Sequence, residues 1–147
     1  MDLNKLTLKS QEALSSAQNI AVTMGHTEVD GEHLLLSLLR QEGGLIPRLL
    51  TRMDAHPEEI ALEAERELSR RSRVSGPGVE PGKIHLSQRL SKLLVFAQED
   101  ASRLKDEYVS VEHLFMRLLE EGDASAAGRA LARAGITPQA FLAVLQD

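Results

Sequence analysis

Apolar residues recur along the chain at intervals of three and four positions, the spacing that places side chains on one face of an α-helix. The first stripe comprises Ala13, Leu14, Ala17, Ile20, Ala21 and Met24. It begins after Thr7, a good N-cap residue, and ends before Gly25. A second stripe comprises Leu90, Leu93, Leu94, Ala97, Ala101 and Leu104. We predict one helix over each stripe.

Cap residues and leucine-rich stripes mark six further helices. Two of them start at Asp30 and Ser110, with Glu32 and Glu112 in the first turn, where the helix dipole favours an anion. The other four are expected over about 45–53 and 125–134, and onward from Pro57 and from Thr137-Pro138. Because β-branched and aromatic residues are scarce, we expect an all-α fold without a sheet.

The chain is an internal duplication. At an offset of 80, Leu6–Arg40 aligns with Leu86–Glu120 with 11 identities in 35 positions, where average residue usage gives roughly two or three. Between the copies lies the 76–82 stretch, in which five of seven residues are Gly or Pro. We therefore predict one domain over 1–147, with eight helices in two pseudo-symmetric four-helix repeats. Repeat 1 covers about 1–70, a linker about 71–84 and repeat 2 about 85–147.

Composition narrows the function. The 147 residues include no Cys, which excludes a disulfide scaffold or a Cys-ligated metal and fits a cytoplasmic location. A net charge of −5 argues against nucleic acid as a partner, because binding to phosphates needs a cationic excess. The longest apolar run, 140–145, has six residues against the roughly 20 of a membrane span. No membrane span or export signal is expected.

Catalytic constellations are missing from the sequence. The Glu32-His33 and Glu112-His113 pairs lack the second His, four positions on, that a zinc-protease helix carries. Serines are plentiful, but none lies in a Gly-x-Ser-x-Gly turn that would expose a nucleophile. We predict a binding domain that is not an enzyme and needs no cofactor or metal.

Several apolar residues of the second copy break the amphipathic pattern. Val95 falls nearly opposite the stripe of its helix and Phe96 at its edge, whereas the first copy has Ser15 and Ser16 there. His113 and Met116 are also expected to project away from the leucine stripe of their helix. Two readings remain open and do not exclude each other: this surface packs against the first copy, or it forms a partially exposed groove for other proteins.

The duplicated motif carries a resemblance to a known family. Residues 29–39 (VDGEHLLLSLL) and 108–119 (YVSVEHLFMRLL) resemble the signature of the Clp amino-terminal repeat domain, and the match covers nearly the whole chain. Within the family, residues 3–7 (LNKLT), the 41–44 turn (QEGG) and residues 106–110 (DEYVS) are most similar to the N-terminal domain of the disaggregating ClpB chaperones.

The resemblance implies a mobile domain that recruits unfolded or aggregated polypeptides. It would be tethered to a homohexameric ATPase whose ATP- and Mg-binding modules are absent from this sequence. By position, Thr7, Asp106 and Glu112 match polar residues that handle substrate in ClpB, and Phe96 and His113 match the apolar groove. Together with Val95, these five residues form the predicted substrate-binding set. Asp100 stands at a position where the family can have an apolar residue, so a more polar groove is expected.

Two alternatives remain. In ClpC-type N-domains, which bind adaptors or phosphoarginine-marked proteins, the two glutamates matched by Glu32 and Glu112 bind phosphoarginine. An ionised Glu suits a guanidinium, since it can accept two parallel hydrogen bonds. The other alternative is a stand-alone helical regulatory protein.

Overall fold

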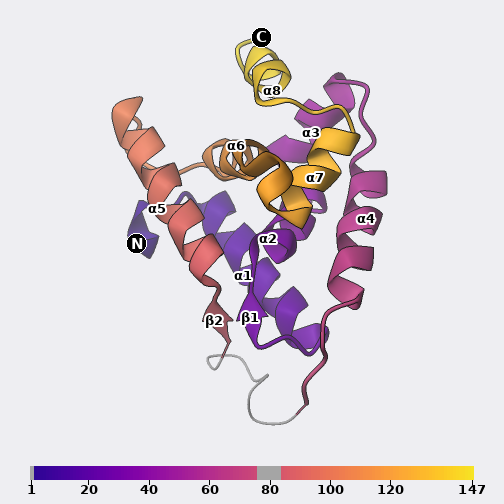
Figure 1. The fold of residues 1–147 in the computed structure, drawn as a ribbon. Coiled ribbons are helices and arrows are strands. Elements are labelled where there is room, and N and C mark those ends of the chain that lie inside the picture. The colour runs from indigo at the N-terminus through magenta and orange to yellow at the C-terminus, as the bar shows by residue number, and fades with distance from the viewer. Residues whose placement is uncertain (1, 76–83) are drawn as a thin grey trace.

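The computed structural model describes residues 2–75 and 84–147, and eight α-helices dominate this part of the chain (Figure 1). They are α1 (Leu8–Thr23), α2 (Gly31–Leu39), α3 (Leu45–Arg52), α4 (Pro57–Ser69), α5 (Gln88–Arg103), α6 (Val111–Glu121), α7 (Ala126–Arg133) and α8 (Pro138–Leu145). Single 3₁₀ turns, Leu3–Lys5 and Gly122–Ala124, precede α1 and follow α6. The predicted all-α fold is confirmed.

The helices begin at the predicted caps. The Thr7 hydroxyl accepts the Ser10 N–H at 3.1 Å, and Ser87, its equivalent in the second half, accepts the Leu90 N–H at 3.0 Å. These contacts satisfy donors that the first turn of a helix leaves unpaired. α3 and α7 have eight residues each, and α1 and α5 have sixteen each, as expected of related halves.

The expectation of no sheet was wrong in a small respect. Two-residue strands, β1 (Glu28–Val29) and β2 (His85–Leu86), pair in parallel, and Leu6 forms an isolated parallel bridge with Val109. Offset by 80, these two pairings are the same contact with the halves exchanged. The extended residues that lead into the helices are partly buried, so their backbone groups need partners, and each half supplies those of the other.

The core is centred on α2 and α6. Every residue of α2 is buried, and it packs against α1, α4, α6 and α7. Leu34 and its counterpart Leu114 are both 0% exposed, and Phe115 packs against Phe141 in a tilted arrangement with ring centroids 4.8 Å apart. Figure 1 shows α2 and α6 in the middle of the molecule, with α5 and α4 on opposite sides. Both halves thus contribute to one continuous core.

The predicted linker falls largely outside the described residues, which stop at residue 75 and resume at residue 84. The repeat boundaries at about 70 and 85 therefore stay a prediction. Within 2–75 and 84–147, no helix has the length and apolarity needed to cross a membrane.

Candidate functional site

A cavity of about 480 Å³ opens between α5, α6 and α8 in the second half of the chain. Its lining includes three of the predicted site residues: Asp106 in the loop before α6, and Glu112 and His113 in the first turn of α6. Met116, Leu142 and other side chains supply an apolar wall. We call this cavity the second groove.

His113 is fixed as part of a helix cap. Its Nδ1 accepts the Ser110 N–H at 2.8 Å, which forms a capping box with the Ser110 side chain. The neutral ring therefore carries its proton on Nε2, which donates to Asp106 Oδ2 at 3.0 Å. Although His113 points into the second groove and away from the buried Leu114 and Leu118, it is only 8% exposed. It lines the groove while holding Asp106 in place.

The first half contains the same histidine cap, but there the histidine pairs with a second histidine instead of an aspartate. His33 Nδ1 accepts the Asp30 N–H at 2.9 Å, and its Nε2 lies 2.8 Å from His26 Nδ1. Both His33 and His113 stand three residues after an N-cap residue, a spacing typical of capping boxes. The repeated spacing could have revealed this structural role in the sequence.

Asp100 lies at the edge of the second groove, and two arginines bind its carboxylate. Arg117 binds it through two hydrogen bonds of 2.6 and 2.7 Å, and Arg103 through one of 2.7 Å. These bonds, those from Arg117 first, lower the pKa of Asp100 below its usual value. The carboxylate that the sequence placed in an apolar groove is thus ionised and paired. Arg117 itself was missed, since it lies 17 residues from Asp100 on another helix.

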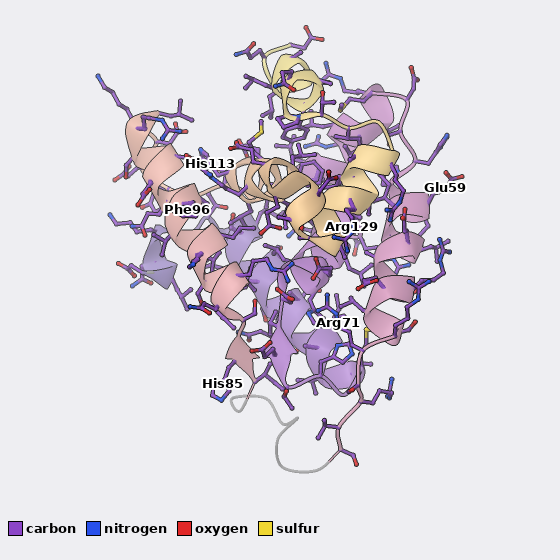
Figure 2. All side chains as sticks on the ribbon, in the orientation of Figure 1. Glu59, Arg71, His85, Phe96, His113 and Arg129 are labelled. Carbon is purple, nitrogen blue, oxygen red and sulfur yellow. The ribbon has the colours of Figure 1, made fainter. Side chains whose placement is uncertain are left out.

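Phe96 covers this ion pair and remains accessible to solvent. The Arg117 guanidinium lies 5.2 Å from the Phe96 ring centroid, within the range of a cation–π contact. Phe96 lines an adjoining cavity of about 270 Å³, and it is 43% exposed, while Val95 is 42% exposed. Both side chains are therefore exposed, as the groove reading expects, and they do not close the core between the repeats. Figure 2 shows Phe96 on α5 on the same side of the molecule as His113.

Thr7 and Val95 do not line the second groove. The Thr7 N–H donates to the Val109 carbonyl oxygen at 3.0 Å, which places Thr7 against the loop that carries Asp106. The structure therefore brings Asp106, Glu112 and His113 together. Phe96 lines the adjoining cavity, while Thr7 lies where the backbone of the first half is hydrogen-bonded to that of the second.

Glu32 and Glu112 are not equivalent, although they occupy matching positions. Glu112 is half-buried and lines the second groove. Glu32 is 0% exposed and receives the Arg71 guanidinium at 2.6 Å and the Ala127 N–H at 2.9 Å, with Arg89 at 3.6 Å. An arginine of the chain itself thus occupies the guanidinium site that the sequence suggested at Glu32.

No cluster of three or more His, Asp or Glu side chains suited to a metal ion occurs within 2–75 and 84–147. The predictions of no enzymatic activity and no cofactor or metal requirement stay predictions.

The sequence of this chain matches a known protein family. The profile of the family described as "Clp repeat (R) N-terminal domain" matches residues 5–134. The chain is 54% identical over 147 residues to "Chaperone protein ClpB" of Nitratidesulfovibrio vulgaris and covers 17% of that protein. It is 43% identical to the Bacillus cereus "Chaperone protein ClpB" over 121 residues, which are 82% of the chain and 14% of that protein. The chain thus spans about a sixth of these relatives.

Solved structures share the fold. The Hsp104 N-terminal domain from Candida albicans superposes with a TM-score of 0.76 at 16% identity, covering 95% of this chain and 88% of that one. The N-terminal domain of the ClpV1 ATPase from E. coli gives 0.77 at 25% identity, covering 97% and 84%.

Proposed function

The chain belongs to the Clp repeat N-terminal domain family, and from that premise we propose that it recruits substrate for a ClpB-type, ATP-dependent disaggregase. In this proposal the second groove and the exposed Phe96 beside it engage apolar segments of unfolded or aggregated polypeptides. The ATP- and Mg-binding modules belong to the remainder of a homohexameric parent protein. A cytoplasmic location remains a prediction.

The observation that carries the proposal is the exposed aromatic ring of Phe96 next to a cavity with an acidic rim. Burying an exposed apolar side chain against a partner is favourable by roughly 25 cal/mol for each Å² removed from water. Phe96 does not stand alone, because Leu104, Tyr108 and Leu142 in the same half are 63%, 47% and 48% exposed. Asp106 and Glu112 then supply acceptors for the backbone N–H groups of an extended peptide.

Weak binding at each groove is compatible with recruitment. A hexamer would present six copies at a high effective concentration, so that a chain released by one domain can rebind at another. We therefore expect low affinity for the isolated chain and much stronger capture by the assembled parent.

The test is binding of a permanently unfolded, carboxymethylated model protein, measured by fluorescence anisotropy. The double variant V95S/F96S, which copies the serines of the first repeat, should bind several-fold more weakly while retaining helicity and melting temperature. Leu62→Ser is the matched control, because Leu62 on α4 is also 43% exposed but lies in the first half. Equal binding by V95S/F96S and the unmodified chain would overturn the proposal.

A second test, in the full-length parent, addresses the polar residues of the second groove. There, Asp106→Ala and Glu112→Ala should impair reactivation of aggregates without stopping ATP hydrolysis. The phosphoarginine alternative instead predicts about two bound phosphoarginine peptides per chain. Burial of Glu32 under Arg71 disfavours that outcome, because a ligand would first have to displace the chain's own guanidinium.

A further inference from the structure

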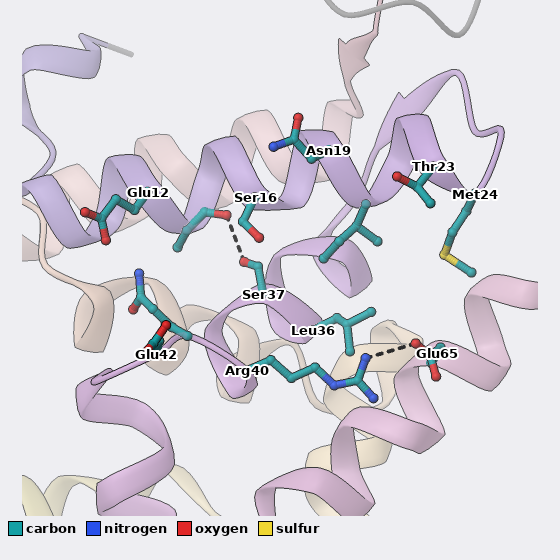
Figure 3. Close-up of a pocket in the computed structure, with 13 residues that line it drawn as sticks. Glu12, Ser16, Asn19, Thr23, Met24, Leu36, Ser37, Arg40, Glu42 and Glu65 are labelled. Carbon is teal, nitrogen blue, oxygen red and sulfur yellow. Dashed lines mark hydrogen bonds and ion pairs between the residues drawn. The ribbon is translucent and has the colours of Figure 1, made fainter.

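Another cavity, of about 690 Å³, lies in the first repeat between α1, α2 and α4 (Figure 3). We call it the first groove. Its floor is apolar and consists of Ala13, Ile20, Met24 and Leu36. The polar residues Ser16, Asn19 and Thr23 line its edge along α1, and all three are exposed. None of the residues assigned to substrate in the preceding sections lines it.

The first groove has the length of a short peptide. Glu12 on α1 and Met24, the residue that caps its C-terminus, both line the groove and are twelve positions apart, which corresponds to about 18 Å at 1.5 Å per residue. Figure 3 shows them toward opposite ends of the cavity. An extended chain rises about 3.3 Å per residue, so five or six residues would span this distance.

At matching positions, the two grooves carry residues of opposite polarity. Ile20 on the floor of the first groove corresponds to the ion-paired Asp100 of the second, and Ser16 on its edge corresponds to the exposed Phe96. Ser37 replaces Arg117, and its hydroxyl donates to the Ala13 carbonyl oxygen at 2.8 Å. No unpaired polar group of Ser37 therefore opposes an apolar side chain that enters the first groove.

Charge at the edge of the first groove indicates what would flank that apolar side chain. Glu12, Glu42 and Glu65 line the groove, and Arg40 bridges Glu65 at 2.9 Å and Glu58 at 2.7 Å. Lys9 also lies at this edge, with its Nζ 3.6 Å from the Glu12 carboxylate and donating to the Glu42 backbone carbonyl at 3.3 Å. The three carboxylates that line the groove thus face two cations, which leaves an excess of one negative charge. Such an edge attracts cationic groups.

We propose that the first groove is a separate peptide site for an extended polypeptide segment in which an apolar side chain is flanked by Lys or Arg. The apolar side chain packs on Ile20 and Leu36, and the basic residues pair with Glu12 and Glu42. This site is independent of the second groove. It gives the domain a second sequence preference, for basic and apolar segments.

The experiment uses the 147-residue chain and a labelled ten-residue peptide of alternating Leu and Lys. Binding is measured by fluorescence anisotropy and located by ¹H–¹⁵N chemical-shift changes. The double variant E12K/E42K reverses two exposed charges and should weaken binding about tenfold. This factor corresponds to about 1.4 kcal/mol, which the loss of two exposed charge contacts of roughly 0.5–1 kcal/mol each would supply. E99K/E107K is the matched control, since it changes the net charge equally at exposed positions of the second half.

The shift changes are expected at Asn19, Thr23 and Gln41, and V95S/F96S should retain them. Shifts confined to the second half would overturn the proposal, as would equal weakening by E12K/E42K and E99K/E107K. Equally tight binding of a Leu and Glu peptide would also overturn it. Because V95S/F96S tests the second groove alone, failure of one groove is distinguishable from failure of the other.

Discussion

Replacing Arg71 by Met should destabilise the fold far more than loss of an ordinary ion pair. Arg71 binds Glu32 at 2.6 Å and Asp30 at 3.2 Å, and Glu32 is completely buried. Removing one partner of a buried ion pair costs about 3–5 kcal/mol, since the other charge remains without compensation. Glu32 would keep the Ala127 N–H and Arg89 at 3.6 Å, so we expect a loss of about 2–3 kcal/mol.

Urea unfolding followed by far-ultraviolet circular dichroism measures this loss. Arg40→Met is the matched control, because Arg40 also binds two carboxylates, Glu58 and Glu65, but at the surface. Exposed pairs contribute about 0–1 kcal/mol each. The double variant E32Q/R71M should recover part of the loss, since it removes the buried charge and keeps an acceptor for Ala127. The reasoning is refuted if Arg71→Met costs no more than Arg40→Met.

Two further predictions concern a buried histidine and a helix cap. Burial, and next the neighbouring His26, lower the pKa of His33 to about 4, so the unfolded chain binds the extra proton as the pH falls below about 6.5. Stability should therefore drop by about 3 kcal/mol between pH 7 and 4, and urea titrations at stepped pH should show a smaller drop in His33→Asn. Thr7→Ala should lower the free energy of unfolding by about 1 kcal/mol, whereas Thr7→Ser should not. Weaker substrate binding by Thr7→Ala at unchanged stability would contradict a capping role and indicate direct contact.

Much of the fold could be predicted because its determinants are local. The stripes, caps and Pro positions act within four residues of each other, so the helix starts at Thr7, Asp30 and Ser110 followed from the sequence. The short strands could not be predicted, because two residues are too few to show an alternating pattern.

The site depended on contacts that sequence spacing does not reveal. Glu32 meets Arg71 and Ala127 across 39 and 95 residues, and Asp100 meets Arg117 across 17. Matching positions therefore suggested that Glu32 and Glu112 act alike, although Glu32 is paired with Arg71 and only Glu112 lines the second groove. The place of Phe96 on its helix, in contrast, marks it as off the core stripe, but the sequence leaves open whether the first copy covers it, and the structure shows it exposed.

The exchanged strand pairing bears on how this domain arose. Leu6 pairs with Val109, and Val29 pairs with Leu86, so each half completes the backbone hydrogen bonding of the other. Two copies of a half-length ancestor would make the same contacts across a two-fold axis, as an isologous homodimer. Fusing the two genes turns an association that depends on concentration into an intramolecular one. Once joined, the copies no longer need identical surfaces, and each groove can evolve its own ligand while the ancestral dimer contact is retained.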